Sequence, residues 1–160
     1  MKKKNILLSM TVTALLAFAA SCTPDGNIPP ADYHFLISNT TMGRLVVKGQ
    51  ISTTTGETSN FHAIVAPQES TELISFVFRD FLSDSYEAAF YSAIADGTVN
   101  ICTVDTEAPL RTWKYQDRKD EEHNPFRRTA RSSTKVSGLD KETGQRTVYI
   151  TFDIRDSDVN

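Results

Sequence analysis

The residues that could bind a charged ligand gather between residue 109 and residue 135. Eight basic side chains occur in this segment: Arg111, Lys114, Arg118, Lys119, Arg127, Arg128, Arg131 and Lys135. Guanidinium and ammonium groups bind phosphate and carboxylate groups through charge-assisted hydrogen bonds. Arg127, Arg128 and Arg131 form a candidate patch for an anionic partner such as a phosphorylated or acidic glycan. The alternative is a solvated loop, because acidic side chains are interleaved with the basic ones: Asp117, Asp120, Glu121 and Glu122.

Groups suited to catalysis or metal binding are sparse. The chain lacks a G-x-S-x-G elbow, a glycine-rich phosphate loop, H-E-x-x-H and C-x-x-C. Its three histidines, expected to be structural or on the surface, are far apart in the chain: His34, His62 and His123. His123 follows an acidic run, but the spacing is not that of a metal site. We therefore predict no catalytic residue, no metal site and no cofactor.

The reactive group with the most specific sequence context is the thiol of Cys22. Lys2, Lys3 and Lys4 form a basic start, and residues 6–20 are uncharged and mostly apolar. This run is shorter than the roughly 20 residues of a membrane-spanning helix, so residues 1–21 read as a secretory signal peptide. The small residues before Cys22 resemble the lipobox of bacterial lipoproteins, although Ala19 replaces the usual Leu, Val or Ile. The resemblance implies that Cys22 becomes the acylated first residue of the mature chain.

The rival interpretation is cleavage by ordinary signal peptidase after Ala17-Phe18-Ala19. Cys22 would then keep a plain thiol, which could pair with Cys102 in an oxidising compartment. If Cys22 carries lipid, Cys102 has no partner in the chain. The alternation of residues 98–104 predicts that Cys102 is a buried, inert thiol. We expect lipidation at Cys22.

Loss of residues 1–21 makes the chain more acidic. It leaves 14 of the 17 Lys and Arg against all 20 Asp and Glu, a net charge of −6. A net acidic domain argues against a nucleic-acid partner, which needs a clustered basic footprint. Residues 22–32 are rich in Pro and polar residues and predict a flexible tether, followed by a single domain at 33–160.

The domain is predicted to be mainly β, with one short helix near 84–95. Strand-like runs occur at 33–38, 44–51, 61–66, 73–81, 98–104, 132–139 and 146–154. The first two runs and the last two are each expected to form a hairpin. The helix should bury Tyr86, Ala89, Phe90, Ala93 and Ile94, with a capping box at Asp84 and Glu87 and a stop at Gly97. These elements favour an antiparallel β-sandwich, Ig-like or related, with a small β-barrel as the alternative.

Beyond the signal peptide, the chain resembles small lipoproteins of the Bacteroidota envelope. The similarity lies in residues 33–39, in Trp113-Lys114-Tyr115, in Asn124-Pro125-Phe126 and in the closing residues 149–158. It implies a β-sandwich in the cell envelope, held to the outer membrane by lipid, and that family offers no catalytic residues to transfer. Both the periplasmic and the surface-exposed orientation fit the sequence.

These observations predict a membrane-anchored, non-enzymatic binding or accessory module whose partner is a glycan or an envelope protein. A small hydrolase or hydrolase inhibitor with a site built from loops is the alternative. A deep pocket that gathers Asp, Glu or His would favour the enzyme, whereas an exposed aromatic patch near Trp113 would favour binding. Assembly by strand exchange is a third hypothesis, and it would need an unpaired terminal strand.

Overall fold

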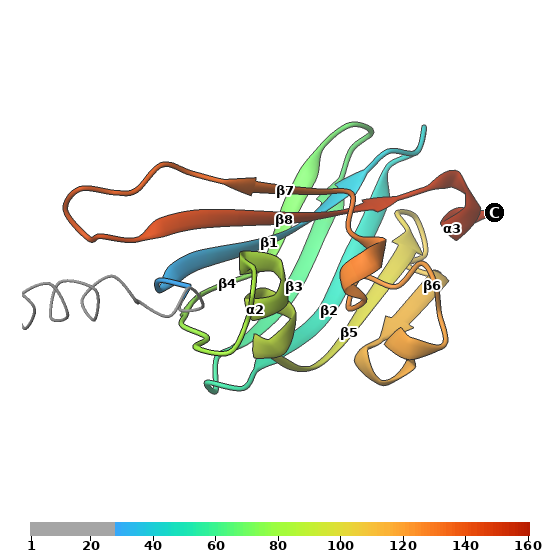
Figure 1. Cartoon of the computed structure of the whole chain (residues 1–160). Helices are drawn as coiled ribbons and strands as arrows, with labels where there is room; N and C mark the ends of the chain where they lie inside the picture. Colours follow the sequence, from blue (N-terminus) through green and yellow to red (C-terminus); the bar gives the residue numbers. More distant parts are fainter. Residues whose placement is uncertain (1–27) are drawn as a thin grey trace, which may run out of the picture.

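The computed structural model describes residues 28–160, which form two packed four-stranded sheets (Figure 1). The predicted signal peptide, Cys22 and most of the predicted tether lie outside the described residues. The first sheet, sheet A, contains β1 (Ala31–Asn39), β4 (Ser70–Phe78), β7 (Ser133–Val136) and β8 (Arg146–Ile154). Sheet B contains β2 (Leu45–Thr53), β3 (Thr58–Val65), β5 (Ile94–Thr103) and β6 (Pro109–Lys114). The predicted β-sandwich is confirmed, and the alternative of a closed barrel is wrong.

Sheet A has the strand order β4-β1-β8-β7. β1 is antiparallel to β4 but parallel to β8, with Ala31 opposite Arg146. The hairpin predicted from residues 33–38 and 44–51 is wrong, since β1 and β2 belong to different sheets. The hairpin of β7 and β8 is confirmed. Because β1 and β8 each have two neighbours, neither is the unpaired terminal strand that strand exchange would need.

Asn39 turns the chain from sheet A into sheet B. Its buried side-chain amide donates to the carbonyl oxygens of Gly43 and Val65, at 2.7 and 3.0 Å. Its side-chain oxygen accepts from the backbone N–H and the hydroxyl of Thr41. This local pairing satisfies the backbone of a tight connection, which explains why two adjacent strand-like runs do not form a hairpin.

The core lies between the sheets and follows the predicted alternation. Every second residue of β1, and of β8 from Val148 onward, is buried, including Tyr33, Phe35, Ile150 and Phe152. α2 (Tyr86–Ala93) covers one end of the core, where the ring of Phe90 lies 5.1 Å from that of Phe35. The predicted apolar stripe is confirmed for Ala89, Phe90 and Ala93, whereas Tyr86 is half-buried and Ile94 belongs to β5.

The boundaries of α2 differ from the predicted ones. Ser85 is the N-cap, and its side-chain oxygen accepts from Ala88 N–H, so the capping box on Asp84 is wrong. The helix ends at Ala93 without a glycine, because Ile94 is already extended and begins β5. Gly97 lies inside β5, opposite Ile51. A Cβ at this position would lie 2.6 Å from the ring of Phe126, so close packing accounts for the glycine.

The segment after β5 folds back over one end of the sandwich. It contains β6 and two short 3-10 helices, η1 (Tyr115–Lys119) and η2 (Arg128–Ala130). Trp113 of β6 is fully buried, with its ring 5.1 Å from that of Phe152. α3 (Asp156–Val159) closes the chain. Within residues 28–160, no helix has the length and apolar character needed to span a membrane.

Candidate functional site

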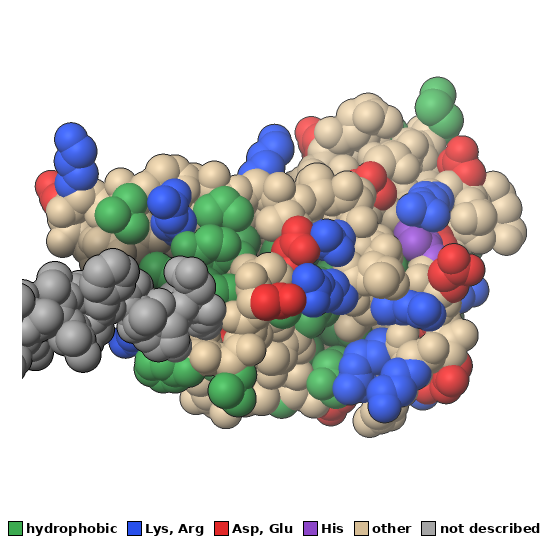
Figure 2. All heavy atoms as spheres, in the orientation of Figure 1, with side chains coloured by type: hydrophobic (Ala, Val, Ile, Leu, Met, Phe, Trp, Pro, Cys, Tyr) green, Lys and Arg blue, Asp and Glu red, His purple; other side chains and the backbone are tan. Residues whose placement is uncertain are grey.

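A hollow of about 550 Å³ opens between α2 and the segment that follows β6. We call it the basic–aromatic hollow. Its wall is formed by Tyr91, Ser92, Tyr115, Arg118, Lys119, Phe126, Arg127 and Arg128. Figure 2 shows Lys and Arg side chains gathered on this face of the molecule. The wall thus holds four cationic side chains and three aromatic rings, and no acidic residue.

Asn124 holds one side of the hollow in place. Its buried side-chain oxygen accepts from Phe126 N–H at 2.9 Å, and its amide donates to Lys114 O at 3.1 Å and to Glu121 Oε2 at 3.0 Å. Its backbone carbonyl accepts from Arg127 N–H. The Asn124-Pro125-Phe126 motif therefore fixes both an aromatic and a basic member of the wall.

The aromatic residues give the hollow an apolar floor and wall. Phe126 is buried and packs edge-on against the ring of Tyr115, with centroids 5.9 Å apart. The hydroxyl of Tyr91 is buried without a hydrogen-bond partner among the described residues. Burial raises the pKa of Tyr91, although the positive charge of Arg131 opposes this, so the phenol stays neutral. The wall therefore contains an uncharged donor that the protein leaves unpaired.

Two of the arginines in the wall are already oriented. The guanidinium of Arg118 lies 3.7 Å from the centroid of the Tyr115 ring and donates to Tyr115 O at 2.8 Å. Arg128 donates to Ser85 Oγ at 3.0 Å. It also lies 3.9 Å from a carboxylate oxygen of Glu87. Side chains held in this way lose less conformational entropy when a ligand binds.

Lys119 and Arg127 are the least neutralised cations of the wall. Arg127 bonds only to Thr129 Oγ1, at 3.0 Å, and within residues 28–160 neither side chain forms an ion pair. Lys119 is exposed and Arg127 is half-buried. Both charged groups are therefore available to form an ion pair with a bound anion.

The structure brings only part of the predicted anionic patch together. Arg127 and Arg128 line the hollow, whereas Arg131 does not and instead forms an ion pair with Glu87 at 2.8 Å. Sequence reasoning missed Arg118, Lys119 and the aromatic residues as members of the site. The signal for Arg118 and Lys119 was present in the basic segment, but nothing in the sequence placed Tyr91 of α2 beside it.

Each of the three histidines is paired with a carboxylate. His34 lies 2.6 Å from Glu72, His62 lies 3.1 Å from Glu107, and His123 lies 2.9 Å from Asp158. The pair of His123 and Asp158 has the composition of a catalytic dyad. However, His123 Nε2 is buried with no partner, and its ring stacks on Phe152 at 4.5 Å. A substrate cannot reach that nitrogen, so we interpret this pair as a structural clamp on α3.

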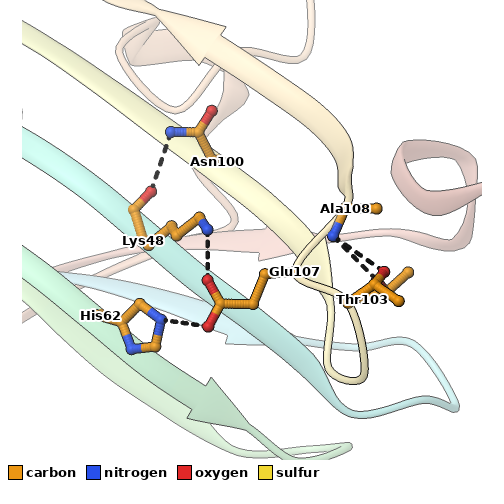
Figure 3. Close-up of polar contacts among 7 residues, drawn as sticks. Lys48, His62, Asn100, Thr103, Glu107 and Ala108 are labelled. Carbon is orange, nitrogen blue, oxygen red and sulfur yellow. Dashed lines mark hydrogen bonds and ion pairs between the residues drawn. The ribbon is translucent and has the colours of Figure 1, made fainter.

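Glu107 joins two strands of sheet B from the turn after β5 (Figure 3). It accepts from Lys48 Nζ at 2.5 Å and pairs with His62 Nε2 at 3.1 Å. The hydrogen bonds from Lys48 and His62 lower the pKa of Glu107, and the bond to Glu107 raises the pKa of Lys48. Glu107 has a φ of 50°, in the left-handed region. We interpret this cluster as a polar strut on an exposed face.

A second hollow, of about 560 Å³, lies on the outer face of sheet A. Its wall is rich in hydroxyl groups and comprises Leu36, Ser38, Ser70, Ser132, Ser133, Lys135, Tyr149, Thr151 and Asp153. Asp153 is its one acidic residue. Neither hollow gathers the acidic or histidine side chains that would favour a hydrolase. In the described part of the chain, no group of three His, Cys, Asp or Glu could hold a metal ion.

Trp113 itself is buried, so it does not form the exposed aromatic patch that would favour binding. Beside it, the half-buried Tyr115 and the buried Phe126 line the hollow. No protein-family model matches this chain, and no curated protein matches it either.

Proposed function

We propose that this protein is a lipid-anchored module of the bacterial envelope that binds an acidic glycan in the basic–aromatic hollow. One observation carries the proposal: four cationic side chains surround a hollow that has aromatic walls and no acidic residue. The anchor is Cys22, through lipid attached to its thiol, and the membrane is the outer membrane. The domain binds its ligand without changing it chemically.

The combination of charge and aromatic surface favours a sugar that carries an acidic group. Tyr115 contributes apolar ring atoms to the wall, beside the Arg118 guanidinium that covers one of its faces, and these atoms can contact the carbon–hydrogen groups of a sugar. Arg118, Lys119 and Arg127 offer N–H donors to carboxylate, sulfate or phosphate oxygens. A neutral glycan would leave these charges without partners, so the acidic group is the main determinant of affinity.

The test measures binding of an oligogalacturonate octamer and a heparin octasaccharide by isothermal titration calorimetry, with maltooctaose as the neutral probe. The protein is the mature chain with Cys22→Ser. We expect the acidic probes to bind and the neutral one not to bind. The variant Lys119→Ser with Arg127→Ser should weaken binding about tenfold or more, because two charge-assisted hydrogen bonds are lost.

The matched control is Arg44→Ser with Lys141→Ser. Both side chains are exposed and lie outside the hollow, and the change in net charge is the same. This control should bind like the parent chain at 150 mM salt. Equal losses in the two double variants would indicate nonspecific attraction and would contradict the proposal, as would equal affinity for maltooctaose.

The anchor is tested separately by intact mass of the protein extracted from the envelope. Lipidation predicts loss of residues 1–21 and a mass increase from acyl chains on Cys22. Three acyl chains would anchor the protein stably, whereas a single chain gives only marginal membrane binding. An unmodified Cys22, or a bond between Cys22 and Cys102, would contradict this part of the proposal.

A further inference from the structure

At one end of the sandwich, the start of the first strand lies beside a group of exposed apolar side chains. Ala31, the first residue of β1, lies opposite Phe78 on one side and opposite Arg146 on the other. The connection from β4 to α2 leaves directly after Phe78, and the turn of the β7–β8 hairpin ends at Arg146. Both loops therefore flank the point where the chain enters the fold (Figure 1).

These two loops and the adjoining strands carry five large apolar residues that are exposed. Leu82 is 95% exposed, Phe81 57% and Leu139 55%. Val77 and Val136, near the ends of β4 and β7, are also exposed. We call this group of five the apolar end; Figure 2 shows hydrophobic side chains at the same end of the molecule. Exposed apolar groups gathered at one place indicate a contact surface.

Local bonds hold the Phe81–Leu82 loop in its shape. The carboxylate of Asp80 accepts from Leu82 N–H at 2.8 Å, from the Ser83 hydroxyl at 2.5 Å and from the Ser92 hydroxyl at 2.8 Å. The guanidinium of Arg79 lies 4.4 Å from the centroid of the Phe81 ring. The loop thus presents its apolar side chains outward from a bonded framework.

The short stretch of chain between Cys22 and β1 limits how far the apolar end can lie from the membrane. Eight residues lie between Cys22 and Ala31, so the nine steps from one to the other span at most about 32 Å at about 3.3–3.6 Å per residue. This step rests on the lipidation of Cys22 in the proposed function. With that anchor in place, the apolar end is the part of the domain that is tied closest to the bilayer.

We infer that the apolar end rests on the lipid surface of the membrane that holds the anchor. The basic residues of the two loops, Arg79 and Lys141, are next in sequence to acidic ones, namely Asp80, Asp140 and Glu142. The contact is therefore apolar and does not depend on anionic lipid. β6 and α3 lie at the other end of the molecule in Figure 1. In this orientation the segment after β6 therefore faces away from the bilayer.

Vesicle flotation tests this inference without the lipid anchor. The mature chain with Cys22→Ser is mixed with phosphatidylethanolamine–phosphatidylcholine vesicles, and with vesicles that also contain phosphatidylglycerol. We expect a measurable fraction to float with both. Phe81→Ser with Leu82→Ser should reduce the partition coefficient about tenfold or more, because these side chains lose their apolar contact with lipid.

The control is Met42→Ser with Ile64→Ser, which removes two side chains that are 89% and 51% exposed and belong to other loops and strands. It should float like the parent chain. Emission from the single buried Trp113 verifies that every variant is folded. No flotation of the parent chain, or equal losses in both double variants, would overturn the inference. Failure of lipidation is seen separately as an unmodified Cys22 mass, since flotation uses a chain without lipid.

Discussion

His34 on β1 donates from Nδ1 to Glu72 on β4, at 2.6 Å. Its other ring nitrogen lies 3.2 Å from Asp32, and the ring stacks on Tyr149 at 5.0 Å. A protonated imidazole can donate to both carboxylates at once, whereas a neutral one can donate to only one of them. The arrangement therefore favours the charged form of His34. The stability of this contact on the outer face of sheet A consequently depends on pH.

The first prediction concerns the pH dependence of stability. Burial lowers the pKa of His34, but the hydrogen bond to Glu72 and the charges of Asp32 and Glu72 outweigh it, so the pKa is raised above 6.5. A raised pKa in the folded state gives stability that is present below pH 6.5 and is lost as pH rises through the folded value. Because the pair is partly exposed, we expect at most about 1 kcal/mol.

The measurement is the urea midpoint between pH 5 and pH 8, followed by Trp113 fluorescence. Glu72→Gln should be less stable than the parent at pH 5.5 and should approach it at pH 8. Glu122→Gln, at an exposed carboxylate without a hydrogen bond to His34, serves as the control and should keep the pH profile of the parent. If Glu72→Gln runs parallel to the parent at all pH values, His34 does not titrate as described.

The second prediction concerns the contact between Gly97 and Phe126. A Cβ on Gly97 would lie 2.6 and 2.7 Å from two ring carbons of Phe126, which is itself buried. Gly97→Ala should therefore destabilise the fold by about 1–3 kcal/mol, as overpacking usually does. It should also weaken binding in the basic–aromatic hollow, because Phe126 must move. Urea unfolding measures the loss of stability, and calorimetry with the oligogalacturonate octamer measures the loss of binding.

Gly138→Ala is the matched control. Nothing lies within 4 Å of a Cβ at that position. Gly138→Ala should leave both stability and binding close to the parent values. Equal stability of the Gly97→Ala variant and the parent would show that Phe126 can shift freely, and the hollow could then not be regarded as preformed.

Some features of the fold follow directly from residue patterns. The alternation of residues 146–154 predicts β8 and its buried face, because side chains of a strand point to opposite sides. The spacing of Ala89, Phe90 and Ala93 likewise predicts the buried stripe of α2. Such local periodicities need no knowledge of the partner element.

Strand partners could not be predicted in the same way. β1 and β8 both alternate cleanly, and that pattern fits any neighbour that shares its core face, so the parallel pairing had no local signal. The hollow was missed for a similar reason. Tyr91 and Glu87 both come from α2. Only the packing of α2 beside η2 places Tyr91 in the wall and brings Glu87 to Arg131.

The third prediction concerns Asn124. Asn124→Ala leaves Phe126 N–H and Lys114 O without the bonds that the side chain supplies, and the site is buried. We expect a loss of about 1–3 kcal/mol in the free energy of unfolding. Asn60→Ala, at an exposed position of β3, should stay within about 0.5 kcal/mol of the parent. Equal effects of the two changes would show that Asn124 does not hold the loop.

The last prediction concerns the cover over Cys102. Cys102 and Val46 are paired on the outer face of sheet B, and each is 1% exposed although both lie outside the main core. The turn after β5 reaches over this face, because Glu107 bonds to Lys48 on β2 and to His62 on β3. Glu107→Ala should release the turn, so that Cys102 reacts several-fold faster with a maleimide in the Cys22→Ser background, where it is the sole thiol.

Asp105→Ala is the control, because Asp105 is an acid in the same turn that makes no such bond among the described residues. This change should leave the rate of the Cys102 reaction unchanged. Equal rates in all three chains would show that the strands alone, and not Glu107, keep the thiol from solvent.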